Sequence, residues 1–181
     1  MRNSRIRFHT KDEWLLIELY EFIHSLNVFY NRLYVFKFHF NKELSSFKYA
    51  LDTSLYYVNN EDALFVNSLT IGSPGFFDFG GLGEILREIR EFYKDFMYRN
   101  RQEEESGDID LDRKRADLEL QNSEVIRRKI RALEEAGFSK EEIKEIITKL
   151  ITPAEKMINS VEKKDIHILE DFGDSDDDVS D

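Results

Sequence analysis

The stretch from Leu64 to Gly83, LFVNSLTIGSPGFFDFGGLG, constrains the fold more than any other part of the chain. Five of the eight glycines and one of the two prolines lie within it. Glycine reaches backbone conformations that other residues avoid, and proline fixes one backbone angle. The residues before this stretch are rich in aromatics, whereas those after it are charged and have helical spacing. The stretch therefore joins an aromatic-rich N-terminal part to a charged C-terminal part with helical spacing.

Within this stretch, β-branched and aromatic residues predict two strands. Ala63–Ile71 has the strongest strand pattern in the chain, and Phe76–Phe79 is expected to pair with it. Pro74 and Gly75 suit the two central positions of a type II turn between them. The glycines at positions 80, 81 and 83 then predict a tight connection into a helix.

Helical spacing begins early in the chain. Thr10 and Glu13 form a capping-box pattern, which predicts a helix that begins directly after Thr10. Apolar residues follow at helical spacing through Leu15–Leu33, in a stripe wider than a surface helix needs, so a second face should meet the C-terminal half or another copy of the chain. The alternation in Leu33–Phe40 favours a strand, with a continued helix as the other interpretation. Residues 41–60 mix helical spacing with a strand-like Leu55–Val58.

Further helices are predicted after the glycines. One covers about residues 82–98, with an interruption near Ser106-Gly107, and the next covers about residues 109–136. Ile166 and Ile168 could add a short strand. The segment from Glu170 to Asp181 is acidic and nearly free of large apolar residues, which is typical of disorder.

Two helix boundaries are predicted in the C-terminal half. Gly137 suits the position directly after a helix, and Ser139 with Glu142 forms a capping box for the next one. Thr152 begins another capping box, with Pro153 at the favoured first helical position. This second pattern predicts a break and a short additional helix.

The segment from Ile130 to Leu150, IRALEEAGFSKEEIKEIITKL, resembles the opening of ubiquitin-associated domains over its roughly twenty residues. In that family the first helix ends in a Met-Gly-Phe-type turn, and here Ala136 takes the place of the methionine. Two helices joined by a glycine and a capping box account for the same residues, so no family is assigned.

Composition and charge exclude several classes of function. The net charge is −11, and seven acids without a base lie in Glu170–Asp181, which leaves −4 for the rest of the chain. An acidic chain without a basic stripe argues against duplex nucleic acid and against anionic membrane surfaces. The absence of cysteine excludes disulfides and thiolate chemistry. No secretory leader and no apolar run long enough to span a bilayer is present, so we expect a cytoplasmic protein.

Motifs for catalysis, metal or cofactor binding are not found in the sequence. Neither a phosphate-binding glycine loop nor a nucleophile elbow is present, and the four histidines are far apart. Asp108–Glu119 has acids at calcium-loop positions, but Arg113 replaces the required glycine and begins a run of three bases. We read it as the start of a helix. No catalytic group, metal or cofactor is therefore predicted.

These patterns predict an α+β fold that is predominantly α, with a long N-terminal helix and a small sheet. Residues 1–98 should form a compact α+β core, residues 99–169 a helical hairpin region, and residues 170–181 a disordered acidic tail.

We expect a non-enzymatic interaction or regulatory protein that binds a protein partner or associates with itself. Neighbouring residues of a strand face opposite sides, so at least one phenylalanine of the predicted strand Phe76–Phe79 must be covered by another element or by a partner. The predicted contact residues are Phe76, Phe77, Phe79, Leu111 and Leu118. The alternative is a sensor that binds a small ligand, such as a nucleotide, between the sheet and the helix starting near Gly83. Its binding residues would be Gly80, Gly81 and Gly83.

Overall fold

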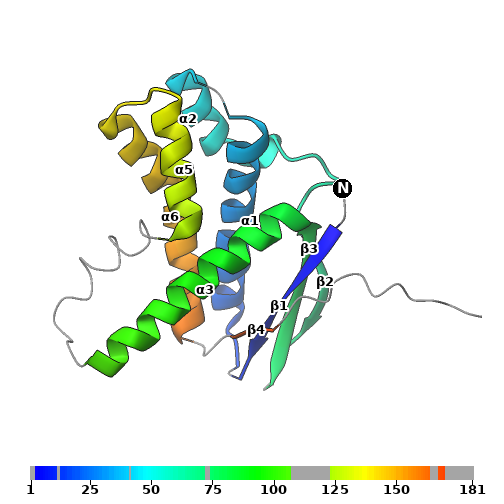
Figure 1. Cartoon of the computed structure of the whole chain (residues 1–181). Helices are drawn as coiled ribbons and strands as arrows, with labels where there is room; N and C mark the ends of the chain where they lie inside the picture. The colour runs from blue at the N-terminus through cyan, green and yellow to red at the C-terminus, as the bar shows by residue number, and fades with distance from the viewer. Residues whose placement is uncertain are drawn as a thin grey trace, which may run out of the picture.

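The structure, a computed structural model, describes residues 3–11, 13–40, 42–71, 74–106, 123–163 and 167–169. It is an α+β fold dominated by helices, which confirms the predicted class (Figure 1). The predicted segments 107–122 and 170–181, including Leu111, Leu118 and the acidic tail, lie outside the described residues. The elements in chain order are β1 (Asn3–Thr10), α1 (Leu16–Phe38), α2 (Leu44–Asp52), the 3-10 turn η1 (Ser54–Tyr56), β2 (Phe65–Thr70), β3 (Gly75–Leu82), α3 (Gly83–Ser106), α5 (Glu124–Glu135), α6 (Lys140–Lys163) and β4 (His167–Leu169).

The strands form one sheet in the order β2-β3-β1-β4, and every neighbouring pair is antiparallel. Helices α1 and α2 and the turn η1 come between β1 and β2, and α3, α5 and α6 come between β3 and β4. This order is the split β-α-β, or ferredoxin-like, arrangement with helices added to it. Helices α1 and α3 cover one face of the sheet (Figure 1). The two predicted strands within residues 63–79 are confirmed by the pairing of β2 with β3, whereas the predicted turn between them includes residues 72–73, which lie outside the described residues.

The core between sheet and helices is built from aromatic rings. Phe8 of β1 and Phe22 of α1 meet edge to face at 5.1 Å between ring centres, and Phe77 and Phe79 of β3 surround them. All four side chains are fully or almost fully buried. The same buried cluster continues into α5 and α6, so residues on both sides of the predicted division at position 98 share one core.

The beginning of the chain differs from the prediction. A strand, β1, occupies residues 3–10, and the first helix starts at Leu16 rather than directly after Thr10. Ile6 and Phe8 alternate into the core with Thr10, which is the period of a strand. The cap of α1 is supplied further along the chain, where the Glu18 carboxylate accepts a hydrogen bond from the Leu15 amide at 2.9 Å.

The predicted strand at Leu33–Phe40 is wrong, because α1 continues to Phe38. The aromatic residues that suggested alternation also lie four positions apart, so they meet on one helix face. Tyr34 contacts Phe38 with 4.7 Å between ring centres. Leu33 and Phe36 are buried, since other helices pack around this end of α1. Leu55–Val58 is likewise not a strand, because η1 and a turn occupy it.

The predicted break at Pro153 is also wrong, because α6 runs unbroken through it. Proline has no backbone N–H, so the Lys149 carbonyl loses its partner within the helix. The guanidinium of Arg32, on α1, donates a hydrogen bond to this carbonyl instead. The Thr152 hydroxyl bonds the Thr148 carbonyl at 2.7 Å and is not a cap. The apolar stripe therefore continues in phase, with Leu150, Ala154 and Met157 buried.

The boundary near Gly137 is confirmed. Gly137 has φ of +88°, and the Phe138 amide bonds the Leu133 carbonyl at 3.1 Å, as in a Schellman cap. The capping box of α6 is reciprocal, since the Ser139 amide donates to Glu142 at 2.7 Å and the Glu142 amide donates to the Ser139 hydroxyl at 3.3 Å.

We predict that Arg32 and Pro153 are coupled in stability. Arg32→Met leaves the Lys149 carbonyl without a donor and should lower the free energy of unfolding by about 1–3 kcal/mol. In a Pro153→Ala background the new backbone N–H reaches that carbonyl, so the same substitution should cost about 1 kcal/mol less. Urea unfolding of the four proteins measures this coupling, and strictly additive losses would contradict it.

Candidate functional site

Side chains cover two of the three glycines that predicted a ligand loop, Gly80 and Gly81, whereas Gly83 is partly exposed. Gly80 and Gly81 lie in β3, and Gly83 begins α3. A Cβ atom on Gly80 would lie 2.2 Å from the ring of Phe65, and one on Gly81 would lie 2.9 Å from the hydroxyl of Tyr30. These two glycines therefore allow two rings to rest on the strand. The proposed nucleotide at this place has no support from their surroundings.

The hydroxyl of Tyr30 connects three parts of the chain. It donates to the Asp62 carbonyl at 2.5 Å and accepts from the Leu82 amide at 2.8 Å, at the end of β3. Tyr34 donates to the carboxylate of Asp62 at 2.9 Å. Burial raises the pKa of Tyr30 to about 12, so the hydroxyl remains a donor at all physiological pH values. The Tyr30 hydroxyl therefore joins helix α1 to the sheet and to the loop before β2.

The three predicted phenylalanines do not lie on one surface. Phe77 and Phe79 are in the aromatic core and have 0% and 1% of their surface exposed. Phe76 lies on the opposite face of β3 and is half-buried. The Arg7 guanidinium covers its ring, with 4.7 Å from Cζ to the ring centre. In this fold Phe77 and Phe79 offer no surface to a partner.

The sheet face that carries Phe76 is closed by a polar network. Arg7 Nε donates to one oxygen of Asp78 at 2.5 Å and Nη2 donates to the other at 2.6 Å. The Ser68 hydroxyl adds a hydrogen bond to Asp78 at 2.8 Å. The bonds from Arg7, and then from Ser68, hold the pKa of Asp78 below its ordinary value. This pair was not predicted from the sequence, although an acid between aromatic residues of a strand favours a cross-strand partner of opposite charge.

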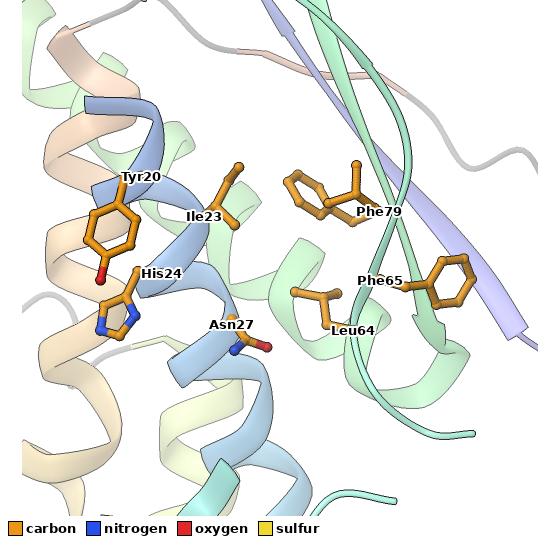
Figure 2. Close-up of a pocket in the computed structure, with 8 residues that line it drawn as sticks. Tyr20, Ile23, His24, Asn27, Leu64, Phe65 and Phe79 are labelled. Atoms are coloured by element: carbon orange, nitrogen blue, oxygen red, sulfur yellow. The ribbon is translucent and has the colours of Figure 1, made fainter. Parts of the chain in front are cut away.

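A groove of about 290 Å³ lies between α1 and β2 (Figure 2). Its walls are mostly apolar, and its polar groups come from α1, where the rings of Tyr20 and His24 are stacked at 5.6 Å. In Figure 2 Leu64 points towards α1, whereas the ring of Phe65 lies on the other side of β2. The lining residues are Tyr20, Ile23, His24, Asn27, Leu64, Phe65, Val66 and Phe79.

Large apolar side chains remain exposed along this groove and beside it. On α1, Leu16 and Tyr20 are four residues apart, so both lie on the helix face that Ile23 and Asn27 present to the groove. Thr10 and Thr70 lie at the same end of the sheet, so the start of α1 and the end of β2 are close in space. We call this region the α1–β2 surface. Its members and exposed fractions are Leu16 82%, Ile17 59%, Tyr20 60%, Val66 49%, Leu69 40% and Ile71 62%.

The edge of the sheet beside this surface is open. Within the described residues β2 pairs only with β3, so its other side presents unpaired backbone groups. Exposed edge strands are usually protected by lysine, proline, an inward charge, a β-bulge or a short length. The sequence of β2, FVNSLT, has no charge and no proline, so its protection is limited to its short length and the register shift at Asn67.

The described residues hold no group of three or more His, Asp or Glu side chains placed to bind a metal ion. None of the helices that the structure describes is both long and apolar enough to cross a membrane. Arg128 pairs with Glu91, and Lys129 pairs with Glu88, so these charges join α5 to α3. Both pairs have a structural role between two helices.

We predict that Tyr30→Phe destabilises the protein more than Tyr34→Phe does. The first change leaves the buried Leu82 amide without its partner and also removes the part-buried bond to the Asp62 carbonyl, which costs about 1–3 kcal/mol. The second change removes one bond to a carboxylate that water can reach. Urea unfolding at neutral pH compares the two variants, and equal losses would contradict the central role of the Tyr30 hydroxyl.

We predict a pH-dependent loss of stability in Asp78→Asn. The folded protein lowers the pKa of this carboxyl, so its stabilisation is present above the unfolded-state pKa near ~3.9 and is lost as pH falls through the folded-state value. The variant should be about 1–3 kcal/mol less stable than wild type at neutral pH, and the difference should shrink below about pH 4.

Urea unfolding of both proteins between neutral and acidic pH tests this. Asp52→Asn is the control, since Asp52 forms an exposed pair with Lys149 that contributes little. A gap between wild type and Asp78→Asn that stays constant into acid would contradict the assignment.

Comparisons with known proteins add no family. No family model matches this chain, and neither curated proteins nor solved structures include a significant match. The ferredoxin-like arrangement of its strands gives no function by itself, since many unrelated activities occur on such folds. The chain's own contacts and exposed side chains are therefore the grounds for a functional proposal.

Proposed function

We propose that this chain is a non-enzymatic interaction protein that binds a protein partner through the α1–β2 surface. The observation that carries the proposal is the concentration of exposed apolar side chains beside an open strand edge. Soluble monomers rarely leave a contiguous apolar patch larger than a few hundred Å² exposed. At roughly 100 Å² for each of its six side chains, the α1–β2 surface presents on the order of 600 Å².

The chemistry of the surface favours a protein over a small molecule. The groove holds about 290 Å³ and is open along one side, so it would enclose only a small part of a drug-sized ligand. It has room for one or two apolar side chains, as hot-spot pockets at protein interfaces do. The neighbouring strand edge offers backbone hydrogen bonds to an extended segment. Tyr20, which is 60% exposed, belongs to a residue type enriched at interfaces.

Site-specific photocrosslinking tests the proposal. A photoreactive phenylalanine analogue in place of Tyr20 should crosslink to a protein partner in native cells. The same analogue in place of Tyr56, which is 85% exposed at the other end of α1, should not. Mass spectrometry identifies the product, and binding is then measured with the purified partner.

Two lysine variants complete this test. Ile71→Lys should weaken binding by about tenfold or more, because it places a charge in the apolar contact. Leu55→Lys is the matched control, since Leu55 is 63% exposed and Ile71 is 62% exposed. The absence of a product at position 20, or equal products at positions 20 and 56, would overturn the proposal.

A further inference from the structure

We infer that the α1–β2 surface is occupied by a second copy of this chain, through antiparallel pairing of β2 with the β2 of that copy. This inference rests on the proposed function and names the partner. A two-fold axis beside β2 would join the two sheets edge to edge and bring the two α1 helices next to each other. Each copy would supply the same surface to the other.

The backbone edge of β2 is the first support. The strand carries no charged side chain, so two copies of FVNSLT meet without repulsion between like charges. Antiparallel pairing of a strand with its own copy satisfies backbone groups on both edges at once. The register shift at Asn67 shortens the regular edge to Ser68–Thr70. Backbone bonds alone are therefore few, and the flanking apolar side chains must contribute most of the binding energy.

The area of the flanking side chains is the second support. With on the order of 600 Å² of apolar surface from each copy, the contact would bury on the order of 1,200 Å² in total before the strand edges are counted. Specific protein interfaces begin at about this size. Leu16 and Tyr20, which are exposed on α1, extend the contact beyond the strand. The two copies would therefore meet through their α1 helices as well as through their β2 strands.

Charge favours a second copy over the chain's own C-terminal segment as the occupant. Glu170–Asp181 has seven acids, and its large apolar residues are Phe172 and Val179. Placing such a segment on the α1–β2 surface would desolvate carboxylates beside leucine and isoleucine side chains without a counter-charge. A second copy brings apolar side chains that can cover those of this surface.

Sedimentation velocity of the full chain across a wide micromolar range tests the inference. The mass should rise from 21.6 kDa towards twice that value with concentration. Added salt should leave association unchanged or strengthen it, because the contact is apolar and each copy carries −11. A mass that stays at that of one chain at every concentration would overturn the inference.

Lysine substitutions locate the contact. Leu69→Lys and Ile71→Lys should each raise the midpoint concentration of association by about tenfold or more. Leu55→Lys should not change it. Circular dichroism checks that the variants keep their fold. Association that survives both substitutions would place the contact elsewhere and overturn the inference.

Hydrogen exchange of the wild-type chain gives a readout that needs no variant. Amides of residues 65–71 should become protected as concentration rises, whereas those of η1 should not. Unchanged exchange at residues 65–71 in an associated sample would also overturn the inference. If the chain stays monomeric while position 20 crosslinks to a different protein, the inference fails and the proposed function stands.

Discussion

The hydrogen bonds of the Tyr30 hydroxyl determine where the elements of this fold lie relative to one another. One side chain from the middle of α1 reaches the end of β3 and the loop before β2. Gly81 makes this possible, because any Cβ atom there would collide with the ring. The loop is held at Asp62, so β2 begins at a fixed distance from α1. The groove between α1 and β2, and the open edge beside it, are consequences of this attachment.

Sequence patterns predicted correctly those parts of the fold that depend on interactions between residues close together in the chain. The pairing of β2 with β3 and the Gly137 boundary follow from turn and cap chemistry within a few residues. The errors share a different origin. Residues 33–38 continue α1 because neighbouring elements bury Leu33–Phe36 on several sides of the helix. Helix α6 passes Pro153 because Arg32, far away in sequence, donates a hydrogen bond to the freed carbonyl. Such contacts are decided by tertiary packing, which periodicity does not record.

The candidate site, too, could be predicted from the sequence only in part. Alternation correctly required that Phe76 and its neighbours face opposite sides of the sheet. It did not reveal that Arg7, on a strand missed in the sequence, would cover Phe76. The exposed members of the α1–β2 surface have the residue types of a core, so nothing in their spacing separates Leu16 from a buried leucine. The one sequence signal is the run Leu15-Leu16-Ile17, which is broader than one helix face can bury.

The sheet face opposite the helices and the sheet edge at β2 differ in how their exposed groups are covered, and this difference supports the proposed function. On the face opposite the helices, Asp78 is satisfied by Arg7 and Ser68, and a phenylalanine ring covers Gly80. At the β2 edge, within the residues that the structure describes, the register shift at Asn67 and the short strand are the protection present, although one lysine there would discourage association more strongly. The charges on one face of the sheet are paired with each other, whereas the edge at β2 and the apolar side chains beside it are uncovered. Such an edge is suited to pair with another protein chain. The strand sequence, neutral and without proline, makes β2 itself a compatible segment.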